Sequence, residues 1–357
     1  MKEARTGGPH PSRAMDPTTG ERRTSRRSFL MPTVYLVALA VVLAGCSSSS
    51  TGAKKSESPT ARSESPAARG GSVVLDDPAV DEVGVAVSAD YFAWSSNSET
   101  SPDQWNTYVR PVGGGEATKL NPNGTQSDNF GIDGSTVVYE VFNGSNDDLK
   151  MYDAATQTQS GLPQIDTQLH EYQPTLSGDW LLFTRSKPDQ WQKVILFNLS
   201  TGEQRTLAQA PLPSTILRAG QVNGDWVTFE HCHDRWASGG TYSNCNVFRY
   251  QISTGDLVTI PNPGLQQFEG GVSQDGTVYL TSTGGADMAE CGADAQIIRY
   301  PVGGPGVVIA TFDAGFEPEL KRATDESDGS TTLYFVRTDC SSSRNGIYSI
   351  ANADTAT

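Results

Sequence analysis

The chain has 357 residues, of which 41 are acidic and 26 basic, so its net charge is −15. Residues 1–45 contain seven of the basic and three of the acidic residues, which leaves the rest of the chain with 19 basic and 38 acidic residues and a net charge of −19. An acidic surface of this kind repels polyanions, so we expect neither nucleic-acid binding nor flat adsorption to an anionic membrane.

Residues 1–45 have the layout of an export signal. Arg26 and Arg27 precede a mainly apolar run over residues 29–44. The run is interrupted by Pro32 and is shorter than the ~20 residues that a membrane-spanning helix needs. We therefore expect a signal peptide over residues 1–45; the alternative is an uncleaved signal anchor.

Two short motifs resemble bacterial export signals. Leu43-Ala44-Gly45-Cys46 resembles a lipobox, which implies that Cys46 is acylated and begins the mature protein, and two or more acyl chains give stable membrane attachment. The sequence SRRSFL, beginning at Ser25, resembles a twin-arginine signal, which implies export of the folded protein. We expect a lipoprotein anchored at the extracytoplasmic face of the cell membrane.

Residues 46–71 are rich in serine, alanine, proline, lysine and glutamate and contain almost no large apolar side chain. Such a segment buries too little surface to offset the entropy lost on ordering. It is predicted to be a disordered tether with a typical reach of about 25–30 Å.

Residues 72–357 contain an internal repeat. Six short apolar runs recur at intervals of 44 to 55 residues, and each follows a pair of residues that suits a tight turn. Asp and Gly in such pairs accept the positive φ angles of hairpin turns, so each turn is predicted to join two antiparallel strands. The runs begin at Phe92, Val137, Leu181, Val227, Val278 and Leu333.

A second apolar series follows each run, and a Gly-containing turn and a polar segment follow that series. The unit is therefore strand, turn, apolar strand, loop, apolar strand, turn and polar outer strand. Six such units over residues 72–357 predict an all-β, six-bladed β-propeller of four-stranded antiparallel blades. A two-layer sandwich is the alternative, but it predicts cleaner alternation of apolar and polar residues and no fixed repeat.

The sixth unit ends after its third strand, because only the sequence ANADTAT follows residue 350. The apolar segment SVVLDD, residues 72–77, has no place in the first unit. Since an unpaired sheet edge promotes aggregation, we expect residues 73–75 to pair with the third strand of the sixth blade and close the ring.

The third unit, residues 174–207, resembles the repeat of TolB-type propellers and the related WD-like repeats of bacterial periplasmic proteins. The resemblance extends over residues 72–357 through the turns and the apolar runs. It implies the six-bladed fold and an extracytoplasmic setting. It implies no catalytic residues, because the fold supports both binding proteins and enzymes.

The tetrapeptide PDQW occurs at residues 102–105 and again at residues 188–191. Both copies are predicted to lie between the second and third strands of their blades, and Trp236 is expected in the same loop of the fourth blade. One interpretation is that each ring covers its own blade. The other is that Trp105, Trp191 and Trp236 form a binding rim, since Trp is enriched at binding hot spots.

Four cysteines follow Cys46, and an even number in an exported domain indicates disulfides. Their positions in the repeat favour Cys232–Cys245 and Cys291–Cys340, although two other pairings are open. His231 and His233 would share one face of a strand and could hold a metal, but no third histidine is near, so no metal site is predicted. Calcium binding by acidic residues remains an open alternative to the absence of a cofactor.

No G-x-S-x-G, H-E-x-x-H or phosphate-loop motif occurs in residues 72–357, so no catalytic residue is assigned. The predicted function is a monomeric, membrane-anchored binding or scaffolding module for a protein, peptide or glycan. The alternative is a propeller enzyme, a lactonase-like or quinoprotein-like hydrolase or oxidoreductase with a pore-facing site, with or without calcium.

The lipid anchor is tested by replacing Cys46 with alanine. Because acylation needs the cysteine thiol, the Cys46→Ala protein is expected to lose lipid modification and membrane attachment. Fractionation of cells into membrane and soluble material checks this outcome. A variant that is processed and stays membrane-bound would contradict the lipobox interpretation.

Overall fold

The computed structural model describes residues 71–77, 79–98, 101–235, 242–261, 266–283 and 294–356. The predicted signal peptide, Cys46 and the predicted tether lie outside these residues. The described residues form strands, turns and irregular segments, and none of them belongs to a helix that could span a membrane.

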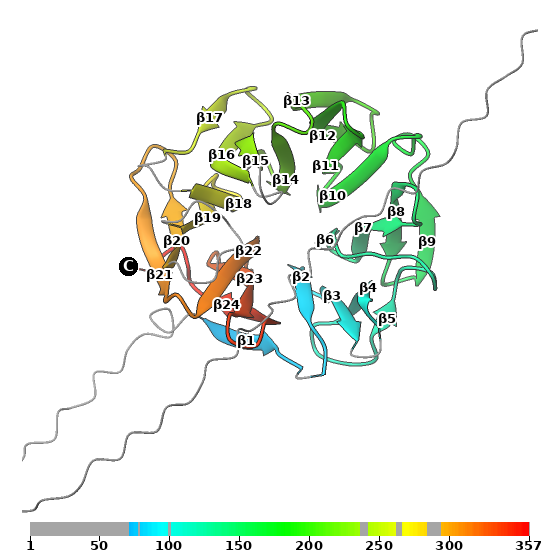
Figure 1. Ribbon diagram of the computed structural model, residues 1–357, viewed down its shortest axis with the longest axis horizontal. Coiled ribbons are helices and arrows are strands. Elements are labelled where there is room, and N and C mark those ends of the chain that lie inside the picture. Colours follow the sequence, from blue (N-terminus) through cyan, green and yellow to red (C-terminus); the bar gives the residue numbers. More distant parts are fainter. Residues whose placement is uncertain are drawn as a thin grey trace, which may run out of the picture. The chain divides into compact units, whose positions relative to one another are not determined.

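The strands form six four-stranded antiparallel sheets arranged around a central axis (Figure 1). The predicted six-bladed propeller is therefore confirmed. Blade 1 comprises β2 (Glu82–Val87), β3 (Tyr91–Ser98), β4 (Ser101–Pro111) and β5 (Thr118–Lys119). Blade 2 comprises β6 (Phe130–Asp133), β7 (Thr136–Phe142), β8 (Asp147–Asp153) and β9 (Thr158–Gly161). Blade 3 comprises β10 (His170–Ser177), β11 (Trp180–Lys187), β12 (Trp191–Asn198) and β13 (Gln204–Pro211).

The other three blades repeat this order, with one exception at the chain's beginning. Blade 4 comprises β14 (Ile216–Asn223), β15 (Trp226–Arg235), β16 (Tyr242–Gln251) and β17 (Leu257–Thr259). Blade 5 comprises β18 (Gln266–Val272), β19 (Val278–Thr283), β20 (Ala295–Tyr300) and β21 (Val307–Phe312). Blade 6 comprises β22 (Phe316–Asp325), β23 (Thr331–Asp339), β24 (Arg344–Ile350) and, as its outer strand, β1 (Ser72–Leu75).

The predicted tight turns join the first and second strands of the blades. Gly134, Gly178 and Gly224 adopt φ values of 54°, 55° and 56°, in the left-handed region that favours glycine. We call the end of the ring that carries these turns the turn face. The opposite end carries the connections between second and third strands and between successive blades, and we call it the loop face.

Neighbouring blades enclose a separate apolar cluster at each of their six interfaces. Between blades 2 and 3, for example, Val138 and Leu149 pack against Phe183 and Ile195, and all four are buried. The second strand of each blade is covered on both sheet faces, which explains its continuous apolar run. Full burial of a side chain such as Phe183 contributes about 1.5–3 kcal/mol.

The innermost strands approach one another so closely that glycine is needed at several points. A Cβ atom on Gly131 would lie 2.6 Å from the Cα atom of Thr175 in the next blade. Five of the six innermost strands also contain a register shift against their partner, which increases local twist and redirects side chains. The shifted strands are β2, β10, β14, β18 and β22.

Strand β1 closes the ring, as the sequence predicts. Ser72 pairs with Ser349 and Val73 with Tyr348, and Figure 1 shows β1 beside β24 at the edge of blade 6. Asp76 follows β1, and its Oδ1 atom lies 2.7 Å from Nη2 of Arg344. First and last parts of the domain are thereby joined by both backbone pairing and an ion pair.

The position of the first PDQW segment differs from the prediction. Residues 188–190 of the second copy form the turn between β11 and β12, as expected, but residues 102–105 lie inside β4. The reason is that β3 and β4 remain paired as far as Ser98 and Ser101. The strands of blade 1 therefore extend through the region that forms a turn in blade 3.

The closing strand can be tested by deletion. Removal of residues 72–77 exposes the edge of β24 and separates the two ends of the domain, so thermal unfolding should occur at lower temperature and with lower cooperativity. Removal of residues 47–71 is the control and should leave unfolding unchanged. Calorimetry of both variants decides the question, and identical melting curves would contradict a structural role for β1.

Candidate functional site

Two polar side chains bridge the central channel. The Nε2 atom of Gln221 on β14 donates to the carbonyl of Ala323 on β22 at 2.7 Å, and its Oε1 atom accepts from the amides of Ala323 at 2.9 Å and Val272 at 3.2 Å. Arg322 on β22 donates to the carbonyl of Phe130 on β6. These contacts connect blades 2, 4, 5 and 6, and two cavities lie along the channel.

The two cavities differ in size and charge. The one toward the turn face has a volume of about 290 Å³, and the one toward the loop face about 80 Å³. Small-molecule sites typically occupy about 300–1,000 Å³, so the loop-side cavity is too small for most metabolites. It is nevertheless highly charged, and its lining includes Asp128, Arg218, Glu230, Lys321 and Arg322.

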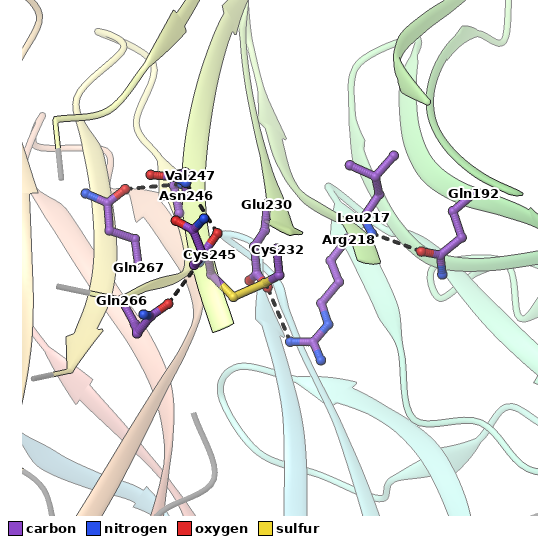
Figure 2. Close-up of a disulfide and its surroundings, with 11 residues drawn as sticks. Gln192, Leu217, Arg218, Glu230, Cys232, Cys245, Asn246, Val247, Gln266 and Gln267 are labelled. Carbon is purple, nitrogen blue, oxygen red and sulfur yellow. Dashed lines mark hydrogen bonds and ion pairs between the residues drawn. A yellow bond between two sulfur atoms is a disulfide. The ribbon is translucent and has the colours of Figure 1, made fainter. Parts of the chain in front are cut away.

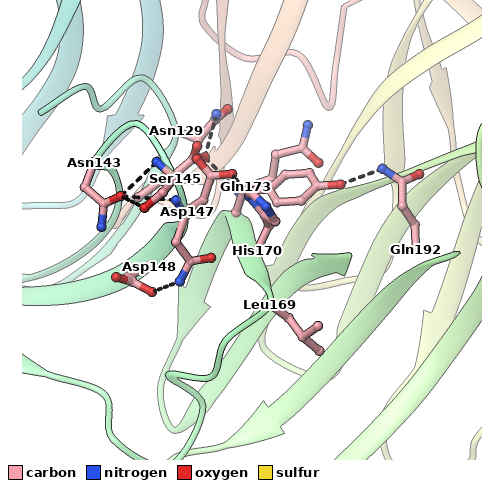
Figure 3. A network of polar contacts seen from close by, with 12 residues as sticks. Asn129, Asn143, Ser145, Asp147, Asp148, Leu169, His170, Gln173 and Gln192 are labelled. Atoms are coloured by element: carbon pink, nitrogen blue, oxygen red, sulfur yellow. Dashed lines mark hydrogen bonds and ion pairs between the residues drawn. The ribbon is translucent and has the colours of Figure 1, made fainter. Parts of the chain in front are cut away.

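A network of buried polar groups lies between blades 2 and 3, near the loop-side cavity (Figure 3). Nδ1 of His170 lies 2.7 Å from Oδ2 of the buried Asp147. Asn129 donates to Oε2 of Glu140 at 2.9 Å, and the amide of Gln173 contacts the same oxygen at 3.4 Å. Burial, followed by the charges of Asp128 and Asp147, raises the pKa of Glu140 well above its usual value.

The contact between His170 and Asp147 favours the tautomer of the imidazole in which Nδ1 carries the proton. When Nδ1 donates its proton to the carboxylate, Nε2 is left as an acceptor that can take a proton or coordinate a metal. The imidazole is partly accessible, because 21% of the His170 side chain is exposed, against 6% for Asp147. This pair is the described arrangement best suited to acid–base chemistry.

Cys232 and Cys245 form the predicted disulfide, with an S–S distance of 2.00 Å (Figure 2). Both cysteines are buried and lie opposite each other on β15 and β16. The Oε1 atom of Gln266 accepts from the amide of Cys245 at 2.9 Å, which ties this pair to blade 5. Cys340 is also disulfide-bonded, and Cys291, its predicted partner, lies outside the described residues.

Glu230 lies between the disulfide and the loop-side cavity. Its Oε1 atom is 3.5 Å from Nη1 of Arg218 and 3.0 Å from Sγ of Cys232. The second contact is not a hydrogen bond, because a disulfide sulfur has no proton to donate. The disulfide also removes Cys232 from the set of possible metal ligands.

His231 and His233 lie on one face of β15, with ring centroids 3.9 Å apart. Burial, and then the charge of His233, lowers the pKa of His231 to about 4. With this pKa, His231 is neutral at physiological pH. The two histidines share one face of the strand, as the sequence predicts. No group of three possible metal ligands within the described residues includes either histidine.

The candidate tryptophan rim is only partly described. Trp105 and Trp191 are both half-buried, and Nζ of Lys193 lies 4.7 Å from the centroid of the Trp191 ring. Trp236 lies outside the described residues. A shared role of the three rings in binding stays a prediction.

Sequence reasoning did not single out Glu140, Asp147, His170, Gln221 or Arg322. These residues belong to no local motif, and they meet only because the innermost strands converge on the axis. The available signal was positional: Glu140 and Asp147 flank the short connection between the second and third strands of blade 2.

No family model and no curated protein matches this chain. Among solved structures, it is similar to a putative TolB from Agrobacterium tumefaciens, with a TM-score of 0.49 and 13% identity, covering 77% of this chain and 91% of that one. It is also similar to TolB from Acinetobacter baumannii, with a TM-score of 0.47 and 14% identity. The match covers 73% of this chain and 64% of that one, so this chain spans less than two thirds of that protein. A third similar structure is oligogalacturonate lyase from Vibrio parahaemolyticus, with a TM-score of 0.41 and 12% identity, covering 77% of this chain and 78% of that one. Likeness at these identities concerns the fold alone.

Glu82, at the start of β2 beside the closing segment, is a buried carboxyl whose titration should affect stability. Burial, together with the charges of Asp76 and Asp77, raises its pKa from 4.5 to about 7. The folded protein therefore binds this proton more tightly than the unfolded chain does. The contribution of Glu82 to the free energy of unfolding is therefore fully present below pH 4.5. It is lost as the pH rises toward 7 and above.

The Glu82→Gln variant has no carboxyl to titrate at this position, so its unfolding free energy should not fall for this reason as the pH rises. The difference in unfolding free energy between the variant and the original protein is expected to grow in favour of the variant from pH 5 to 7.5, by at most about 3 kcal/mol. Denaturant unfolding of both proteins across this range measures it. His231 titrates in the opposite sense, but it is present in both proteins and cancels. A pH-independent difference would contradict a buried, proton-binding Glu82.

Proposed function

We propose that the protein is a lipid-anchored, extracytoplasmic binding module that presents the loop face of its propeller to a protein, peptide or glycan. The observation that carries the proposal is where the chain enters the domain. Ser72 pairs with Ser349 near the end of β24, and β24 runs toward the turn face. A tether that ends at Ser72 therefore joins the turn face and leaves the loop face free.

The small loop-side cavity supports a surface-binding role. Gln221 and Arg322 reach across the channel, and the loop-side cavity of about 80 Å³ leaves little room for a substrate of ordinary size. A larger partner would instead contact the rim of the ring. Its affinity would depend on a few anchors such as aromatic side chains. Trp105 and Trp191, at matching ends of blades 1 and 3, are the candidates.

An enzyme with a site near the channel is a second candidate function, supported by the pair of His170 and Asp147. The buried carboxylate orients the imidazole through Nδ1 and leaves Nε2 as the proton acceptor that a general base needs. An activity that is lost in His170→Gln and kept in His233→Gln would support this alternative.

The binding proposal is tested by site-specific photo-crosslinking in cells that make the protein. Gln190 lies exposed on the loop face, next to Trp191, and Asp179 lies exposed in the turn between β10 and β11 on the turn face. A photoreactive residue at position 190 should give a discrete crosslinked product, and one at position 179 should not.

The tryptophans are tested in the same assay. Because loss of a hot-spot side chain costs 2 kcal/mol or more, Trp105→Ala combined with Trp191→Ala should reduce crosslinking from position 190 by about tenfold or more. Equal products from both faces, or an undiminished product in the double variant, would contradict this use of the loop face.

A further inference from the structure

Three carboxylates meet at the loop face between blades 2 and 3, beside the network of His170 and Asp147 but on other sides of the strands. Asp148 is on β8, Asp166 is in the connection between β9 and β10, and Glu171 is on β10. One carboxylate oxygen from each residue lies within 4.8 Å of the others. These residues come from two blades, so only the folded ring assembles them.

Unpartnered buried oxygens distinguish this cluster from an ordinary acidic surface. Glu171 is completely buried, and its Oε2 atom has no hydrogen-bond partner. Asn146 donates from Nδ2 to Oδ1 of Asp148 at 2.7 Å, while its own buried Oδ1 atom has no partner. These oxygens cannot donate, so only a proton, a water molecule or a cation can satisfy them.

Such oxygens are few in the described part of the protein. Four buried amide or carboxylate oxygens lack a partner there; two belong to Asn146 and Glu171, and a third belongs to Asp147 of the neighbouring network. The fourth belongs to Glu82, whose pKa of about 7 allows a proton to occupy it. A buried polar atom without a partner costs about 1–3 kcal/mol, so the unpartnered oxygens of Glu171 and Asn146 favour a ligand at this cluster.

Nearby cations leave part of each carboxylate available. Nε of Arg185 donates to Oε1 of Glu171 at 2.7 Å, which leaves Oε2 of that carboxylate. Nζ of Lys150 lies 3.6 Å from Oδ2 of Asp166, which leaves Oδ1. Burial and the charge of Asp166 raise the pKa of Asp148, as expected where carboxylates repel one another.

The ligand chemistry suits calcium, because every candidate ligand atom is an oxygen. Calcium binds oxygen ligands at about 2.3–2.6 Å, so ligands on opposite sides of the ion are separated by about 5 Å. The three carboxylate oxygens lie within 4.8 Å of one another, close enough for one ion to contact all three. Magnesium requires shorter distances and a nearly ideal octahedron, and zinc favours nitrogen and sulfur ligands.

We propose that Asp148, Asp166 and Glu171 bind one calcium ion, with Oδ1 of Asn146 as a further ligand. The ion ties blade 2 to blade 3 at the loop face and satisfies the buried oxygen of Glu171. This inference is independent of the proposed binding function, because it concerns an ion held by the propeller itself.

The test uses the full chain, purified in detergent and freed of divalent ions with a chelator. Calcium chloride is titrated by calorimetry, and the melting temperature is measured with and without calcium. We expect one ion per chain with a Kd of about 0.1–1 mM, as in extracellular calcium modules, and a higher melting temperature at about 5 mM calcium.

The deciding variant is Asp148→Asn combined with Asp166→Asn, because both side chains are partly exposed and the change removes two ligand charges. It should weaken calcium binding by about tenfold or more. Without calcium it should melt no lower than the original protein, since repulsion is relieved. Asp256→Asn, an exposed change in blade 4, is the matched control and should bind calcium normally.

Three results would overturn the proposal. The first is the absence of both binding heat and a melting shift at about 5 mM calcium, several times the expected Kd. The second is calcium binding by the double variant that equals that of the control. The third is equally tight binding of magnesium, which would contradict the assignment to calcium.

Discussion

The pairing of β1 with β24 is the contact on which the propeller depends. Five blades are completed by four consecutive strands, whereas the sixth takes its outer strand from the start of the chain. Among the described residues, the interface between blades 6 and 1 also has the fewest buried apolar side chains of the six, namely Val85, Phe92 and Ile347. Backbone pairing and the Asp76–Arg344 ion pair therefore reinforce the junction where apolar packing is thinnest.

Closure of the ring also determines what the channel can contain. Once six innermost strands surround one axis, the space between them is narrow, and Gly131 lies where a Cβ atom would meet the backbone of the next blade. The polar side chains that remain, Gln221 and Arg322, satisfy backbone groups of other blades. The interior is thus crossed by polar contacts between blades, and the buried carboxylates of blades 2 and 3 lie toward the loop face.

The loop face combines rigidity with buried charge. Asp147, Glu140 and Glu171 are buried carboxylates held by strands of blades 2 and 3, and one oxygen each of Asp147 and Glu171 lacks a hydrogen-bond partner. The disulfide of blade 4 fixes Cys232 and Cys245 beside Glu230 on the same side of the channel. Rigid strands thus support a surface on which a small change in ligand or proton occupancy can alter the local charge.

By itself, the sequence determined the architecture, because propeller information is local and repeated. Each turn pair and apolar run specifies a hairpin, and six repetitions, with a missing outer strand in the last, specify the ring and its closure. The pairing of Cys232 with Cys245 was accessible for the same reason, since the two residues bracket one hairpin. The length of β3 and β4 could not be predicted in this way. The PDQW segment favours a turn locally, but in blade 1 the two strands stay paired through it.

Only the tertiary structure decided the chemistry. Gln221 and Ala323 are 102 residues apart along the chain, and Arg322 and Phe130 are 192 apart, yet ring closure brings both pairs into hydrogen-bond contact. Asp148 and Glu171 likewise come from different blades. Their roles depend on burial and on neighbours from other repeats, and no spacing in the sequence encodes either quantity. The fold follows from local periodicity, whereas the sites arise where separate repeats converge.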